Sequence, residues 1–117
     1  MRILVTGDRN YRNAVEVYSN LQYETEGRDA VVVHGDAKGA DTYAEVCAQL
    51  LGVPTEPHPA DWDKYGRRAG PVRNQEMLDS GIDYWIAFHD NIAESKGTAD
   101  MIERCKKAGI PGRLIGG

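Results

Sequence analysis

Two glycines four residues apart, Gly35 and Gly39, lie in the segment 31–41, where an apolar run of three valines gives way to a helical pattern. The valines are typical of a buried strand, and the apolar spacing of residues 40–51 is typical of a helix. A glycine turn between a strand and a helix leaves backbone N–H groups free at the helix N-terminus, which favours a phosphate group. The segment therefore predicts a phosphate site. The alternative is an ordinary connection with two glycines at positive φ, since neither G-x-G-x-x-G nor a P-loop is present.

Two other polar, glycine-containing loops follow predicted strands and precede predicted helices. Residues 7–10 follow the strand 3–5, and residues 89–97 follow the strand 83–88. In an open parallel sheet, ligands bind beyond the carboxyl ends of the strands. We therefore expect these two loops and the loop 34–41 to line one pocket.

A basic run in residues 64–73 lies in front of a helix predicted to begin near Pro71. The run has four cationic side chains and no acidic one: Lys64, Arg67, Arg68 and Arg73. Arginine forks bind phosphate or carboxylate. We expect Arg73, in the first turn of that helix, to point at the pocket, and most of the other three to be solvated. Trp62 and Tyr65 could stack on a base, although aromatic residues of small domains more often belong to a core or an interface.

Each of the three histidines follows a predicted strand and has an aspartate nearby: His34 with Asp36, His58 with Asp61, and His89 with Asp90. No tight ligand spacing such as H-x-x-x-H occurs, so we predict no metal site and no cofactor. A pocket histidine that hydrogen-bonds a ligand or a carbonyl is the better hypothesis. No nucleophile motif such as G-x-S-x-G is present.

Composition limits the class of protein. The 117 residues, with 41% hydrophobic and 27% charged side chains, fit one globular domain over residues 1–117. No apolar run approaches the roughly 20 residues of a membrane helix, so we expect no membrane association. A net charge of −4 argues against general nucleic-acid binding. Cys47 and Cys105 lack C-x-x-C spacing and predict buried free thiols in a reducing compartment, which indicates the cytoplasm.

The predicted elements alternate between strands and helices. Strands are expected at 3–5, 30–33, 53–59, 83–88 and 113–115, and helices at 11–24, 40–51, from residue 71 to before Gly81, and 97–108; residues 60–71 fit no regular element. Three prolines mark the strand 53–59 as an edge. The alternation predicts a single α/β domain of three layers, with a mainly parallel five-stranded sheet and helices on both faces.

Four blocks of sequence, 6–9, 34–41, 69–77 and 97–101, resemble the SLOG superfamily, and specifically its YspA/YpsA-related branch. The resemblance implies a Rossmann-like fold, a nucleotide or nucleotide-derived ligand, and a homodimer. Relatives in the superfamily include sensors of NAD-derived nucleotides, the DNA-processing protein of natural transformation, and the "lonely guy" phosphoribohydrolases, which cleave the N-glycosidic bond of nucleoside 5′-monophosphates.

The resemblance also implies a set of ligand-binding residues from the glycine loops and the helix that carries Arg73. These are Gly7, Asp8, Arg9, His34, Gly35, Asp36, Lys38, Gly39, Ala40, Asp41, Arg73, Asn74, His89, Gly97 and Thr98.

The enzymes of the superfamily carry P-G-G-x-G-T-x-x-E after the fourth strand, and this chain departs from that pattern. It lacks the Pro-Gly-Gly, and the position of the Glu falls on Met101, which cannot move a proton. Arg73 matches the pocket arginine of the enzymes, while Glu94 or Asp90 could supply a carboxylate from the loop. Arg73 and Glu94 are therefore the candidate catalytic residues.

The sequence predicts a protein that binds or senses a nucleotide-derived small molecule such as ADP-ribose. Two alternatives stay open: an N-glycosidase acting on nucleoside 5′-monophosphates, and a module that binds single-stranded nucleic acid.

Overall fold

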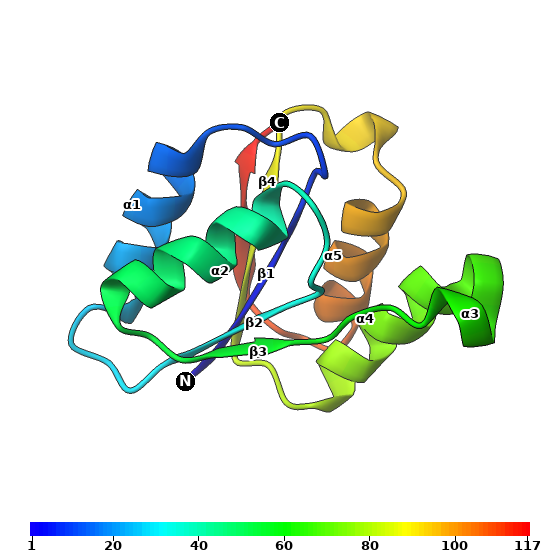
Figure 1. Ribbon diagram of the computed structural model, residues 1–117, viewed down its shortest axis with the longest axis horizontal. Helices are drawn as coiled ribbons and strands as arrows, with labels where there is room; N and C mark the ends of the chain where they lie inside the picture. The colour runs from blue at the N-terminus through cyan, green and yellow to red at the C-terminus, as the bar shows by residue number, and fades with distance from the viewer.

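The computed structural model, which describes residues 1–117, has one five-stranded sheet of order β3-β2-β1-β4-β5 (Figure 1). All four strand pairings are parallel. The strands are β1 (Arg2–Gly7), β2 (Val31–His34), β3 (Thr55–Pro57), β4 (Tyr84–His89) and β5 (Gly112–Gly116). The predicted α/β fold with a parallel five-stranded sheet is confirmed.

Helices cover both faces of this sheet. α1 (Ala14–Thr25) and α2 (Ala40–Leu51) lie on one face, and α4 (Ala69–Asp79) and α5 (Gly97–Lys107) lie on the other (Figure 1). The central strand β1 supplies both cores, because its side chains alternate between the faces. Ile3 and Val5 pack in the core under α1 and α2, and Leu4 packs in the core under α4 and α5. The three layers are therefore those predicted.

The strand order reverses between β1 and β4, and this reversal places the site. The chain leaves β1 toward α1 on one face, and it leaves β4 toward α5 on the opposite face. The two connections diverge and leave a crevice at the carboxyl ends of these adjacent strands, where ligands bind in such folds.

The first helix begins three residues later than the predicted start at Tyr11. Asn13 is the N-cap, and its side chain accepts a hydrogen bond from the N–H of Glu16 at 3.2 Å. Tyr11 is instead buried against Phe88, with ring centroids 5.5 Å apart.

The segment 60–71, which had no predicted element, is mostly helical. It forms α3 (Trp62–Tyr65), the 3₁₀ turn η1 (Gly66–Arg68) and the start of α4 at Ala69. Asp61 caps α3 by accepting from the N–H of Lys64 at 3.1 Å. Because α4 begins at Ala69 and not near Pro71, Arg73 lies in its second turn.

The third strand is shorter than predicted, but it is an edge strand as expected. β3 covers only Thr55–Pro57, because prolines at 54, 57 and 59 have no N–H to donate to a neighbouring strand. Both cysteines are buried free thiols, as predicted. None of the helices combines the length and the apolar character needed to span a lipid bilayer.

Candidate functional site

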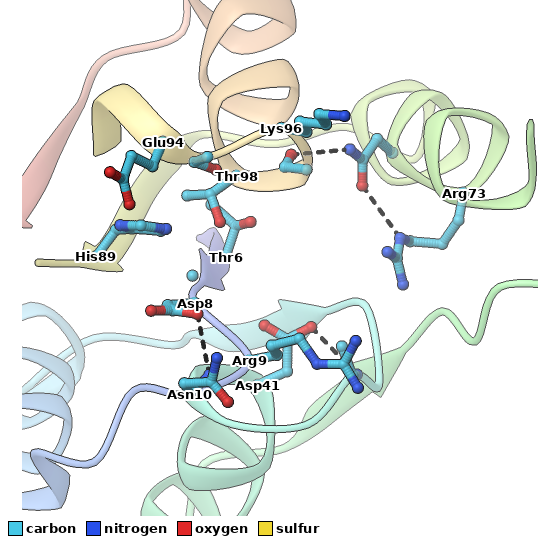
Figure 2. A pocket seen from close by; sticks show the side chains of 15 residues that line it. Thr6, Asp8, Arg9, Asn10, Asp41, Arg73, His89, Glu94, Lys96 and Thr98 are labelled. Carbon is cyan, nitrogen blue, oxygen red and sulfur yellow. Dashed lines mark hydrogen bonds between the residues drawn. The ribbon is translucent and has the colours of Figure 1, made fainter. Parts of the chain in front are cut away.

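A cavity of about 360 Å³ opens between the carboxyl ends of β1 and β4. The turn after β1 forms one wall, the start of α5 forms the opposite wall, and Arg73 of α4 closes one end (Figure 2). Ten predicted residues line it: Gly7, Asp8, Arg9, Asp41, Arg73, Asn74, His89, Glu94, Gly97 and Thr98. Five others that line it were not predicted as site residues: Thr6, Asn10, Ala37, Ser95 and Lys96.

The backbone amides of the loop after β2 are occupied by a side chain of the protein itself. One carboxylate oxygen of Asp41 accepts from the N–H of Gly35 at 3.0 Å and from the N–H of Ala37 at 3.3 Å. Asp41 is only 6% exposed, and burial raises its pKa to about 6, against the opposing effects of His34, Arg73 and the two amides. The predicted phosphate cradle thus holds a carboxylate group.

Gly39 and Gly7 allow close packing between loops. Gly39 has φ +75°, and a Cβ there would lie 2.3 Å from the carbonyl oxygen of Asp8. A Cβ on Gly7 would lie 2.5 Å from the Cβ of Ala40. The N–H of Ala40 donates to the Asp8 carbonyl at 3.1 Å, so the loops after β1 and β2 form one packed unit.

Several predicted residues lie outside the cavity. His34 is 1% exposed; its Nε2 lies 2.8 Å from Oε1 of Glu45, and its Nδ1 accepts from the N–H of Asp36. Asp36, whose φ is +53°, and the fully buried Ala40 also do not line the cavity. Lys38 and Gly39 line a second hollow of about 380 Å³ beside Arg12 and Tyr43.

Arg73 is held in place by two hydrogen bonds. Its Nη1 donates to the carbonyl of Gly35, and its Nε donates to Oδ1 of Asn74 at 3.0 Å. Gly35 permits the first contact, because a Cβ there would lie 2.5 Å from Nη1. Asn74, which is 4% exposed, also donates to the carbonyl of Gly97 at 3.3 Å and to Asp100 at 3.0 Å. Asn74 therefore fixes Arg73 relative to the start of α5.

The start of α5 presents unpaired donors to the cavity. The N–H groups of Gly97 and Thr98 have no acceptor within the protein, whereas that of Ala99 donates to Oγ of Ser95 at 3.1 Å. No atom would lie within 4 Å of a Cβ on Gly97, so the first residue of α5 borders open space. Arg73 and the exposed Lys96 also line this end of the cavity, with Lys96 extending toward α4 and the guanidinium of Arg73 pointing toward Arg9 (Figure 2). This wall is therefore the most favourable place for an anion.

Two carboxylates besides Asp41, and a histidine, also line the cavity. One oxygen of Asp8 accepts from the N–H of Asn10 at 3.0 Å, which leaves the other oxygen available. Nδ1 of His89 accepts from the N–H of Asn91, so Nε2 carries the proton and can donate to a ligand. Glu94 is exposed and lies beside His89 (Figure 2). Hydroxyl groups of a sugar could donate to the carboxylates of Asp8 and Glu94 and accept from Nε2 of His89.

The helix position that carries Glu in the superfamily enzymes contains no acid here. Met101 is fully buried in the core under α5. The neighbouring Asp100 accepts from Asn74 and from Nε of Arg104 at 2.8 Å. Neither side chain supplies a free carboxylate to the cavity.

The residues that the prediction missed had a signal in the sequence. Asn10 lies in the predicted loop 7–10, which Thr6 directly precedes. Ser95 and Lys96 lie in the predicted loop 89–97 and directly precede the Gly97-Thr98 pair that opens a helix. A cation directly before a helix lies near the free amides at its N-terminus, so the sequence position of Lys96 could have identified it as a candidate anion-binding residue.

Sequence comparisons identify proteins similar to this chain. The sequence model of the YspA, cpYpsA-related SLOG family matches residues 1–65. The chain is 38% identical over 117 residues to the Gene 61 protein of Mycobacterium phage D29, covering 94% of this chain and 92% of that protein.

A solved structure is also similar to this one. The X-ray structure of DNA processing protein A from Streptococcus pneumoniae superposes with a TM-score of 0.77 and 22% sequence identity. The match covers 99% of this chain and 50% of the other, so this chain spans half the length of that protein. At this identity the likeness shows the fold alone.

Proposed function

Since the chain belongs to the YspA, cpYpsA-related SLOG family, we propose that the cavity between β1 and β4 binds a nucleotide or a nucleotide-derived ligand. The observation that carries the proposal is the group of donors at the start of α5. The N–H groups of Gly97 and Thr98 are free, and these two residues line the cavity together with Lys96 and Arg73. The cavity lining balances three cations, Arg9, Arg73 and Lys96, with three acids, Asp8, Asp41 and Glu94. The wall formed by Arg73, Lys96 and the start of α5 is the part that fits an anionic ligand.

The proposed arrangement places the phosphate at α5 and a sugar at β1. The phosphate oxygens accept from the amides of Gly97 and Thr98, and Lys96 and Arg73 neutralise their charge. Sugar hydroxyls donate to the available oxygen of Asp8 and to Glu94. The loop after β2, which was expected to hold the phosphate, instead fixes Arg73 through the carbonyl of Gly35.

A binding or sensing role is favoured over catalysis by the burial of Met101 at the position of the enzymes' Glu. Two buried free thiols fit the reducing conditions of the cytoplasm, which is the location we propose. The homodimer implied by the resemblance stays a prediction.

Thermal stability in the presence of nucleotides tests this proposal. AMP, ADP-ribose, NAD and cyclic nucleotides should be compared, because a ligand at 100 times its Kd stabilises the folded state by about 2.7 kcal/mol. Lys96→Ala should weaken binding of the active compound by roughly 10-fold or more, since it removes a charged donor. Lys106→Ala, on an exposed residue near the other end of α5, is the matched control and should bind normally. The absence of any shift across the panel would contradict the proposal.

Glycosidic cleavage is a second candidate, because Glu94 and Asp8 place two carboxylates in the cavity that Arg73 closes. Paired carboxylates can cleave N-glycosides: water adds to the anomeric carbon, the bond to the base nitrogen breaks, and the base leaves with a proton. Incubation with nucleoside 5′-monophosphates should then release free base and ribose 5-phosphate, and Arg73→Ala and Glu94→Gln should abolish the release. Intact monophosphates after long incubation would eliminate this candidate and leave the binding role standing.

A further inference from the structure

A further hollow of about 480 Å³, distinct from the one beside Lys38, adjoins the cavity at the start of α5. It lies between α3, α4 and α5, and its lining includes Trp62, Arg67, Gly70 and Pro71. We call it the Trp62 groove. It shares Arg73, Asn74, Lys96 and Gly97 with the cavity, so the two hollows meet at the proposed phosphate position.

Trp62 is unusually exposed for its type. It is 60% exposed, whereas Trp85 is 4% exposed and donates from its indole N–H to the carbonyl of Ile110 at 3.0 Å. The capped turn of α3 holds Trp62 at the groove, and Gly70 places no side chain beside the ring, since a Cβ there would lie 3.8 Å from Cη2. An indole left accessible beside cationic groups provides a stacking surface for an anionic aromatic ligand.

The two hollows differ in what they can bind. The cavity is lined by polar side chains, and its single apolar one is Ala37, so it suits a sugar and a phosphate. The groove contributes Trp62 and Pro71, which suit the flat apolar face of a base. Its one acid, Asp100, is already bonded to Asn74 and Arg104, so the free charges of Arg67, Arg73 and Lys96 make it cationic.

We propose that the Trp62 groove is the base subsite of a two-ended ligand, in which a phosphate at α5 joins a nucleoside in the groove to a hydroxylated sugar in the cavity. This inference rests on the proposed function and names the class of ligand more closely: a nucleoside diphosphate bearing a sugar, with ADP-ribose as the probe. It also gives α3, which the sequence pattern did not reveal, a role in binding.

Three probes of increasing size test the subsite: ribose 5-phosphate, AMP and ADP-ribose. The unchanged protein should bind ADP-ribose most tightly, because only this probe fills both hollows. Trp62→Ala should weaken AMP and ADP-ribose by roughly 10- to 100-fold, the range of a lost base–aromatic stack. Ribose 5-phosphate has no base, so its affinity should change less than about twofold. Trp62→Phe should retain most of the affinity but lose the ligand-induced change in tryptophan fluorescence.

Tyr65→Ala is the matched control, since Tyr65 lies on the same short helix but does not line the groove. Binding of all three probes should be nearly unchanged in this variant. An equal loss in Tyr65→Ala, or an equal loss of ribose 5-phosphate in Trp62→Ala, would show that α3 acts only structurally and would overturn the subsite.

The remaining outcomes separate the subsite from the function on which it rests. Normal AMP and ADP-ribose binding by Trp62→Ala would overturn the subsite and leave the proposed function intact. ADP-ribose binding no tighter than AMP would overturn the two-ended ligand. Failure of every phosphate probe to bind the unchanged protein would overturn both. Trp62-dependent, strongly salt-dependent binding of oligo-dT without any small nucleotide would replace the subsite with a single-stranded nucleic-acid surface.

Discussion

Two glycine-containing loops at the same edge of the sheet differ in whether their backbone amides are hydrogen-bonded within the protein. In the loop after β2, the amides of Gly35 and Ala37 bind the carboxylate of Asp41. In the loop after β4, the amides of Gly97 and Thr98 bind no protein group. The second residue of the following helix is Asp41 in α2 and Thr98 in α5, so only the first helix supplies a carboxylate at this position. A glycine at a strand–helix junction thus indicates that another group packs closely against the backbone. Whether that group belongs to the protein or to a ligand depends on whether a nearby side chain can accept hydrogen bonds from the loop amides.

The largest expected effect in this comparison is that of Gly39→Ala. A side chain at φ +75° is strained, and its Cβ would lie 2.3 Å from the backbone oxygen of Asp8. We expect a loss of about 4 kcal/mol in the free energy of unfolding, or no folded protein. Urea denaturation measures the change. A loss below about 1 kcal/mol would contradict the description of this loop as closely packed.

The dependence of stability on pH provides the second test, through Asp41. Its folded pKa of about 6 lies above its ordinary value of 3.8, so the folded state holds more protons than the unfolded state between these values. The free energy of unfolding should therefore fall as pH rises from about 4 to about 6, by about 3 kcal/mol. Urea midpoints across this range should show the fall in the unchanged protein and not in Asp41→Asn.

Glu56 does not obscure this test. Its hydrogen bonds with Arg2 and His58 lower its pKa to about 2, so its contribution is lost only as pH falls below its usual range, and it is common to both proteins. Parallel pH profiles for the two proteins would mean that Asp41 does not titrate in this window.

Gly97→Ala should have the smallest effect on stability. Because nothing lies within 4 Å of its Cβ position, the free energy of unfolding should change by less than about 0.5 kcal/mol. Because Gly97 lines the cavity, the added methyl group takes up part of the proposed phosphate position, so affinity for ribose 5-phosphate should fall several-fold. Normal affinity would show that the phosphate lies elsewhere in the cavity.

Apolar patterning was sufficient to predict the fold. Val32 and Val33 enter opposite cores, and the alternation of such residues, with helices between the strands, predicted three layers and a parallel sheet. Short elements were missed, because α3 is a single turn whose caps, Asp61 and Gly66, also occur in ordinary loops.

The sequence predicted where the candidate site lies better than it predicted which side chains contact one another there. The edge of the sheet follows from strand order, but the direction of a side chain depends on partners far away in the sequence. His34 shows this: the alternation from Val32 turns its ring to the face of α2, where Glu45 binds it. Asp41 likewise lies near the predicted pocket, yet its contacts with Gly35 and Ala37 follow only from the folded turn.

The bond between Arg73 and the carbonyl of Gly35 has a consequence for the entropy of binding. A free arginine loses rotamer freedom when a ligand orders it, which costs about 0.5–1.5 kcal/mol of affinity. Here the loop closed by Asp41 already orders the guanidinium during folding, so the ligand meets a preorganised cation. A substitution that removes the hydrogen bonds of Asp41 should therefore weaken binding at α5. The ligand would then have to order the Arg73 side chain, a cost that is otherwise met during folding.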